Sequence, residues 1–171
     1  MAIDLLFNAA NIFVLPFWTL MIVLPGWHIT RRTMASLLPF VALAALYLYF
    51  FALSITPESA SAFSSAGLSD IAQLFADERV AATGWVHFLV MDLLAGRWIY
   101  QDGQTNQIFT RHSLALCLFA GPMGLLSHIA TRWVTNARRG GAEAASAGAE
   151  STGVEPTGAA SPTAGLGEVK Q

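Results

Sequence analysis

The sequence of 171 residues is 54% hydrophobic and only 12% charged, and its formal net charge is −2. Soluble domains carry about 25% charged residues, so a chain with half that fraction, gathered outside long apolar runs, is expected to be an integral membrane protein. The length leaves no room for a large water-soluble domain beside the membrane helices. The sequence has no stripe of basic residues of the kind that would indicate a nucleic-acid partner.

Four apolar runs predict an all-α integral membrane fold with four transmembrane helices. A run of about 20 residues covers about 30 Å, the thickness of the hydrocarbon core of a bilayer. Pro16 is expected to kink the first span, and the second span carries no charge. The predicted spans cover residues 5–24, 34–55, 82–100 and 111–134.

The links between the spans are read from composition. Before the third span, Ser69 can cap a short amphipathic segment, which is either an interfacial helix or an ordinary loop. Asp-Gly and Thr-Asn pairs predict a turn over residues 101–110. From residue 136 the chain lacks periodicity and large apolar residues, which predicts a disordered tail (136–171) after a membrane domain of residues 1–135. With four crossings, the two sides of the membrane carry almost equal numbers of arginines, so the positive-inside rule barely distinguishes the two orientations. The arginines of the first link slightly favour the orientation with the short links on the cytoplasmic side.

Polar residues of the first span share one helix face. Asp4, Asn8 and Asn11 are spaced by four and three residues, which aligns them along the helix. Polar groups in lipid need partners, so this face is expected to contact protein. Hydrogen bonding between helices and a functional site both remain open. Cys117, in the fourth span, is expected to be a small packing residue.

The last two spans carry ionisable residues, each of which costs about 2.5–3.5 kcal/mol in a bilayer on insertion scales. An antiparallel hairpin with its turn near residues 105–106 would place Asp92 opposite Phe119. Small residues such as Gly96 and Gly121 are expected to let the helices approach each other closely. The predicted order along the membrane normal is His87 with His128, then Asp92, then Arg97 with Arg111.

These ionisable residues have functional and structural interpretations. Asp92 with His87 or His128 can supply the acid and the base of a proton transfer. Alternatively, Asp92 pairs with an arginine to fix helix packing, and Arg97 and Arg111 extend to the interface without a chemical role. The sequence has no H-x-x-H, H-x-x-x-H or E-x-x-H element, so neither a metal site nor a cofactor is predicted.

Three long strings are unusual for membrane helices: NIFVLPFWTLMIVLP at residues 11–25, WVHFLVMDLLAGRW at 85–98 and RHSLALCLFAGP at 111–122. They resemble the abscisic-acid-deficient-4-like family, which comprises neoxanthin-synthase-related membrane proteins and was formerly a domain of unknown function. The resemblance covers about residues 7–132. It implies a small multispan protein of carotenoid or xanthophyll biosynthesis.

In plants the family is needed to make neoxanthin from violaxanthin, which opens an epoxide and removes a proton without net redox change. The resemblance therefore implies an isomerase-type reaction, in which Asp92 with His87 or His128 would be the acid and base. Arg97 or Arg111 would stabilise the developing alkoxide.

The sequence is also compatible with two other functions. The chain could be a non-catalytic carotenoid-binding subunit that stabilises a partner enzyme or forms a homo-oligomer, or, with less support, a small transporter that relays protons through Asp92. The residues before the first span resemble neither a plastid transit segment nor a signal peptide. The expected location is therefore a bacterial inner (cytoplasmic) membrane.

Overall fold

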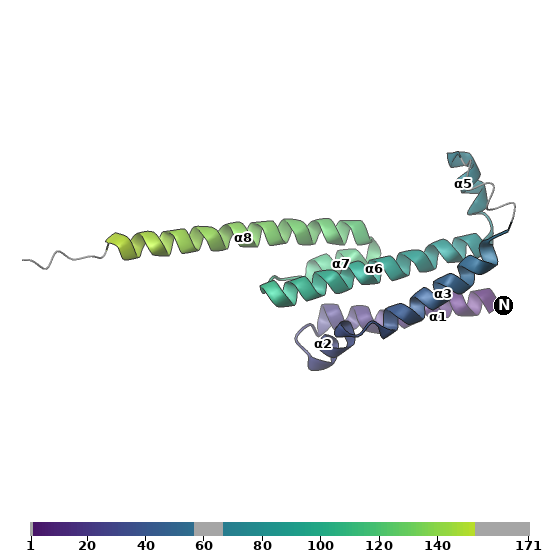
Figure 1. The fold of residues 1–171 in the computed structure, drawn as a ribbon, viewed down its shortest axis with the longest axis horizontal. Helices are drawn as coiled ribbons and strands as arrows, with labels where there is room; N and C mark the ends of the chain where they lie inside the picture. Colours follow the sequence, from purple (N-terminus) through teal and green to yellow (C-terminus); the bar gives the residue numbers. More distant parts are fainter. Residues whose placement is uncertain (1, 57–66, 153–171) are drawn as a thin grey trace, which may run out of the picture. The chain divides into compact units, whose positions relative to one another are not determined.

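The computed structural model describes residues 2–56 and 67–152, and every regular element within them is an α-helix. The chain divides into two compact units, residues 1–135 and 136–171. All packing described below lies within the first unit. The helices, in chain order (Figure 1), are α1 (Ala2–Val23), α2 (His28–Ala35), α3 (Leu38–Ser54), α5 (Leu68–Leu74), α6 (Glu78–Asn106), α7 (Arg111–Phe119) and α8 (Gly121–Thr152).

Helix α6 is the centre of the first unit, because α1, α3 and α7 all pack against it. Gly96 of α6 permits the close approach of α1. A Cβ added at Gly96 would lie 2.6 Å from Cη2 of Trp18, a side chain that is only 3% exposed. The buried core continues from this contact through large apolar side chains that include Met21, Leu93, Ile99 and Leu114.

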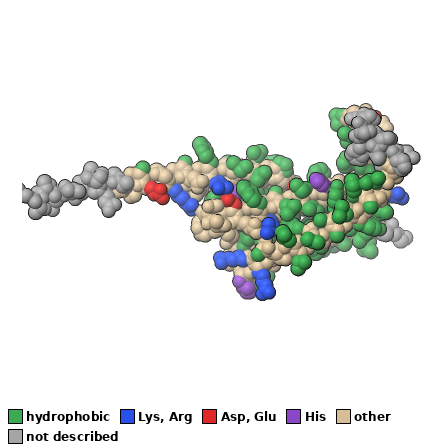
Figure 2. All heavy atoms as spheres, in the orientation of Figure 1, with side chains coloured by type: hydrophobic (Ala, Val, Ile, Leu, Met, Phe, Trp, Pro, Cys, Tyr) green, Lys and Arg blue, Asp and Glu red, His purple; other side chains and the backbone are tan. Residues whose placement is uncertain are grey.

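The outer surface of the helices is strongly apolar. Figure 2 shows hydrophobic side chains spread over the visible face of α3 and α6, and one group of Arg and His side chains around α2, with other basic side chains along α8. In the described part of the chain, α1 is long and apolar enough to cross a membrane by itself over Ile3–Val23. Helices α2 and α3 pass the same test only together, with a bend of 45° between them. Four transmembrane helices are therefore not confirmed.

The expected second span is broken near its start. Helix α2 ends at Ala35 and α3 begins at Leu38, although a single helix was expected over residues 34–55. Pro39 explains the break, because its ring would clash with the carbonyl group of Ala35, four residues earlier, and it has no N–H to donate there. The N–H of Leu38 donates instead to Oγ of Ser36, at 3.2 Å.

The expected fourth span folds back on itself. Helix α7 ends at Phe119, Ala120 is extended at φ −158° and ψ 96°, and α8 starts at Gly121. Pro122 cannot continue α7, because its ring clashes with the preceding turn and it lacks an N–H. This position suits the first turn of a new helix. A single span over residues 111–134 is therefore replaced by a helical hairpin.

Three further boundaries differ from the expected ones. The turn expected at 101–110 is shorter, because α6 continues to Asn106 and only Gln107 adopts a left-handed conformation, with φ 53°. Helix α5 is capped by Gly67, whose N–H donates to Asp70 at 2.9 Å, so Ser69 lies inside the helix. Helix α8 continues to Thr152, past the start of the tail expected at residue 136, because Ala and Glu in this stretch are strong helix formers.

Candidate functional site

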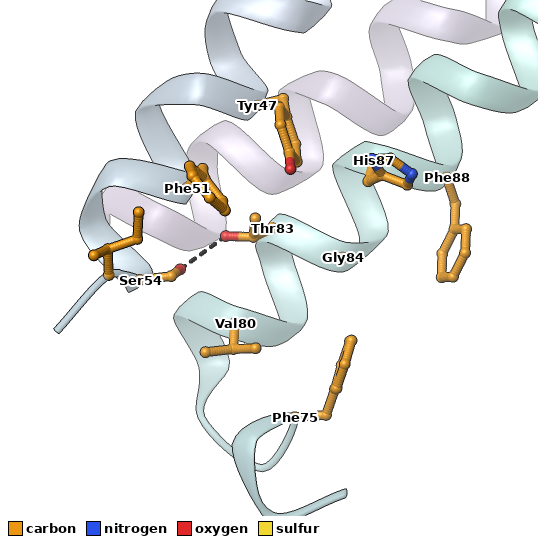
Figure 3. A pocket seen from close by; sticks show the side chains of 10 residues that line it. Tyr47, Phe51, Ser54, Phe75, Val80, Thr83, Gly84, His87 and Phe88 are labelled. Carbon is orange, nitrogen blue, oxygen red and sulfur yellow. Dashed lines mark hydrogen bonds between the residues drawn. The ribbon is translucent and has the colours of Figure 1, made fainter. Parts of the chain in front are cut away.

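An apolar groove with a volume of about 510 Å³ opens between α3, α6 and the end of α5. Its size is typical of a site for a small organic molecule. Aromatic side chains from three segments form its walls, as Figure 3 shows. The lining residues are Tyr47, Phe51, Ser54, Ile55, Phe75, Val80, Thr83, Gly84, His87 and Phe88.

His87 is the one lining residue of this groove that can carry a positive charge. Its ring centroid lies 5.5 Å from that of Tyr47, which is half-buried on α3. Ser54 and Thr83 bring two hydroxyl groups into the lining, with their oxygens 2.8 Å apart. The groove therefore combines long apolar walls with an imidazole, a phenol and a hydroxyl pair.

Asp92 does not line this groove. It lines a separate cavity of about 260 Å³ between α1, α6 and α7, together with Asn11. Its carboxylate lies against Gly121, the first residue of α8, and accepts a hydrogen bond from the backbone N–H there. Cys117 Sγ lies 3.5 Å from the Asp92 carbonyl oxygen. Asp92 thus contacts Cys117 and Gly121, which lie before and after its expected neighbour Phe119 in the sequence. Its carboxylate caps the positive end of α8.

The polar face of the first span has one clear packing contact. Asn11 accepts a hydrogen bond from Nε1 of Trp85 at 2.9 Å and donates to the Phe7 carbonyl oxygen at 2.8 Å. Asp4 lines a different cavity of about 270 Å³ together with Glu78, and Asn8 is exposed. The three residues therefore do not converge on one site.

Arg97 bonds to the backbone at the break between α2 and α3. Its Nε donates to the Met34 carbonyl oxygen at 2.7 Å, and Gln101 donates to the same oxygen at 3.0 Å. This carbonyl needs such partners, because the break directs the N–H of Leu38 to Ser36. The Arg97 guanidinium also lies 5.6 Å from the centre of the Phe40 ring.

Arg111 lies at the end of α1. Its Nη2 donates to the carbonyl oxygen of Val23, the last residue of α1, over a long distance of 3.5 Å. A positive charge at the carboxyl end of a helix is favourable. Neither Arg97 nor Arg111 lines the groove that contains His87.

His128 lies far from the partner that the hairpin predicts. Because α8 folds back, His128 meets Asp102 rather than His87, with 2.9 Å between Nε2 and Oδ2. Nη1 of Arg132 lies 3.0 Å from the other oxygen of Asp102. His128 is fully buried, and its Nδ1 has no hydrogen-bond partner among the residues that the structure describes. The centroid of its ring lies 5.4 Å from that of Trp98.

Asp102 and Tyr47 are the residues that sequence reasoning missed. The sequence predicts that Asp102 belongs to an Asp-Gly turn. His128 and Arg132 lie one turn apart on α8, so both can contact the same carboxylate, and this spacing is the only sequence signal for the role of Asp102. Tyr47 lies in the second predicted span, which offers no candidate among the ionisable residues because it carries no charge. Within residues 2–56 and 67–152, no three His, Cys, Asp or Glu side chains are grouped in a way that could hold a metal ion.

In the residues that the structure describes, the chain is a small helical protein with an apolar surface and an apolar groove that contains a histidine. It belongs to the ABA DEFICIENT 4-like family, whose profile matches residues 5–128. It is 44% identical over 128 residues to Protein ABA DEFICIENT 4, chloroplastic, from Arabidopsis thaliana. That match covers 72% of this chain and 58% of the relative, so the chain spans less than two thirds of the relative's length. No solved structure matches.

These comparisons confirm the family resemblance of residues 11–25, 85–98 and 111–122, which all lie within the matched region. They contradict the expected bacterial inner membrane, because the relative is a plant protein whose name places it in the chloroplast. The expectation rested on the residues before the first span, and these do not fix a compartment.

Proposed function

We propose that this protein binds a carotenoid-like polyene in the groove between α3, α5 and α6 and acts in carotenoid or xanthophyll metabolism. Membership of the ABA DEFICIENT 4-like family supports the metabolic role. The observation that carries the ligand class is the groove itself, whose volume of about 510 Å³ is enclosed mainly by aromatic and aliphatic side chains. Such walls favour a long apolar molecule, because binding becomes stronger as more of the ligand's apolar surface is removed from water or headgroups.

The polar groups of the groove suit a ligand with an oxygenated end. The hydroxyl oxygens of Ser54 and Thr83 can accept a hydrogen bond from a hydroxyl group on the ligand, since their own protons have acceptors within the chain. His87 and Tyr47 add a proton acceptor and a proton donor on the facing helices. A pure hydrocarbon would leave these groups without ligand contacts, so an oxygenated xanthophyll fits better than a carotene.

His87 and Tyr47 can together perform a proton transfer without redox chemistry. Neutral His87 would take a proton from the carbon beside a ligand epoxide, and the electron pair of that C–H bond would form a new double bond. The C–O bond of the epoxide would break, and Tyr47 would protonate the oxygen. Return of the proton from His87 to the Tyr47 phenolate restores the site, and the product is an isomer of the substrate. In this scheme Tyr47 takes the place beside His87 that Asp92 had in the sequence-based hypothesis.

The second candidate function is binding without catalysis, as a carotenoid-holding subunit. It is favoured by the absence of any carboxylate among the residues that line the groove. Both functions require that the protein lie in a membrane, where the apolar outer surface contacts acyl chains and the ligand enters from the bilayer. The exposed Leu, Ile and Phe side chains of α1, α3, α6 and α7 support this location.

The test is the amount of pigment that stays with the protein after purification from a carotenoid-producing host. Gly84→Leu should fill the groove, because a Cβ at Gly84 already meets Phe75 Cε1 at 2.7 Å. We expect the affinity of this variant for the pigment to fall by at least about tenfold, or about 1.4 kcal/mol. Gly26→Leu is the matched control, since nothing lies within 4 Å of its Cβ position. Equal pigment in both variants and the unsubstituted chain would overturn the proposed binding site.

A further inference from the structure

We propose that α7 and the first part of α8 form a re-entrant hairpin, which dips into one leaflet of the bilayer and returns to the side from which it entered. This inference rests on the proposed membrane location. The partner of the hairpin tip would be lipid acyl chains. The chain would then cross the membrane three times, through α1, the bent pair α2–α3, and α6.

The antiparallel course of the hairpin is fixed by three contacts. At its base, Nε2 of His112 lies 2.9 Å from Oγ1 of Thr131. Next to it, one turn earlier on α8, the hydroxyl oxygens of Ser113 and Ser127 lie 3.0 Å apart. Near the tip, Gly124 lies directly against the backbone of Cys117, so closely that no Cβ would fit there. Polar contacts hold the base, and a backbone contact between small residues holds the tip.

The arm length is too short for a crossing. Helix α7 has 9 residues, which span about 14 Å at about 1.5 Å per residue. The hydrocarbon core is about 30 Å thick. The arm therefore reaches about the middle of the bilayer before the chain reverses at Ala120. Several backbone groups of the reversal have partners within the chain, because the N–H groups of Met123 and Gly124 donate to the Ala120 carbonyl oxygen and the Ala120 N–H donates to Leu116.

Apolar side chains are exposed at the tip and along the outer face of the hairpin. Phe119 is 86% exposed, Leu126 67% and Met123 58%, and Trp133, at the base, is 73% exposed, as suits an aromatic side chain at headgroup level. Isolated exposed apolar residues are ordinary on a protein surface, but a cluster at the end of a hairpin indicates an insertion surface. The base carries Arg111 and Arg132, which can reach headgroup phosphates. The charge pattern therefore matches a hairpin inserted tip-first into a leaflet.

The base lies at the same end of the first unit as α2. Arg111 donates to Val23 at the end of α1, and Arg97 donates to Met34 of α2. At the opposite end, Asp4 and Glu78 line one cavity. Four crossings would separate Arg132 from Arg31 and Arg32, which is why the positive-inside rule was almost balanced. Three crossings and a re-entrant hairpin gather Arg31, Arg32, Arg111 and Arg132 on one side.

The test is the labelling of single introduced cysteines in sealed vesicles with a membrane-impermeant maleimide. The substitutions are Ala76→Cys, Gln107→Cys and Asn136→Cys, all at exposed positions. The native Cys117 is buried, so the unsubstituted chain measures the background. We expect positions 107 and 136 to be labelled from the same side and position 76 from the other side.

Labelling of positions 76 and 136 from one side, with 107 on the other, would overturn the hairpin in favour of four crossings. Extraction of the unsubstituted chain by alkaline carbonate would instead overturn the membrane location on which both proposals depend. These two failures are distinguishable, because a chain with four crossings stays in the membrane after carbonate treatment. Retention in the membrane, with 107 and 136 on one side, would support both proposals.

Discussion

Nε2 of His128 lies 2.9 Å from Oδ2 of Asp102, between residues that the sequence assigns to a membrane span and to a turn. The pair exists because two local features changed the course of the chain. Helix α6 continues through Asp102 to Asn106, and α8 runs back toward that end of α6 after the reversal at Ala120. Arg132 and Asn106 complete the ring of polar groups around the Asp102 carboxylate.

Asp102→Asn should lower the thermal stability of the purified protein. The variant removes the charge that His128 and Arg132 share and leaves one of them without an adequate partner. Because Arg132 is partly exposed, we expect a loss of about 2 kcal/mol, within the range for a buried polar group left unsatisfied. Asp70→Asn, at the exposed start of α5, is the control and should leave the melting temperature nearly unchanged. Equal melting temperatures for both variants would contradict a stabilising Asp102–His128 pair.

Gly124→Ala should destabilise the hairpin of α7 and α8. The new Cβ would meet the backbone of Cys117, which cannot move as a side-chain tip can, and overpacking of this kind costs about 1–3 kcal/mol. Gly140→Ala is the control in the distal part of α8, where nothing lies within 4 Å. There the helix propensity of Ala predicts a gain of up to about 1 kcal/mol. Thermal unfolding in detergent should thus shift in opposite directions for the two variants.

Arg97→Ala should weaken the junction of α2 and α3 without emptying the groove. Arg97 donates to the Met34 carbonyl oxygen, and a hydrogen bond to a charged group contributes about 1.5–3 kcal/mol. Gln101 also donates to this oxygen, so the loss should lie at the lower end of that range. The melting temperature should fall while the pigment bound per protein stays constant. Loss of product formation at an unchanged melting temperature would restore the catalytic interpretation of Arg97.

Asp92→Asn separates the capping role of Asp92 from a chemical one. Asn keeps an oxygen that can accept from the Gly121 N–H but loses the negative charge at the start of α8. Charges at this position contribute about 0.3–1 kcal/mol, so a small drop in melting temperature is expected, with pigment binding and any product formation retained. If the variant folds and binds pigment but forms no product, Asp92 acts in the reaction and the assignment of the acid role to Tyr47 fails.

His87→Phe tests whether the groove only binds its ligand or also transforms it. Phenylalanine keeps an aromatic ring beside Tyr47 but cannot accept a proton. We expect pigment binding to persist, because the wall stays apolar, and product formation to stop. Pigment analysis of the host, together with pigment bound to the purified variant, reads the two effects separately. Unchanged pigment composition with and without the native chain would favour the non-catalytic function.

The sequence determined the class of the protein because composition and local periodicity are properties of short stretches. The apolar runs identified where helices form, and the strings at residues 85–98 and 111–122 identified the family. The register of the expected hairpin placed Asp92 opposite Phe119, which lies between the two observed neighbours Cys117 and Gly121. These inferences need only hydrophobicity, helix geometry and resemblance, none of which depends on the path of the whole chain.

The tertiary structure decided which residues meet. A register argument assumes an unbroken helix, so the single reversal at Ala120 moved His128 from the expected His87 to Asp102. His87 and Asp92, five residues apart on α6, face different cavities because such a spacing turns the helix by about 140°. Breaks at Pro39 and Pro122 depend on local rules that are visible in the sequence. The direction that the chain takes after each break depends on packing against α1 and α6, which no local pattern contains.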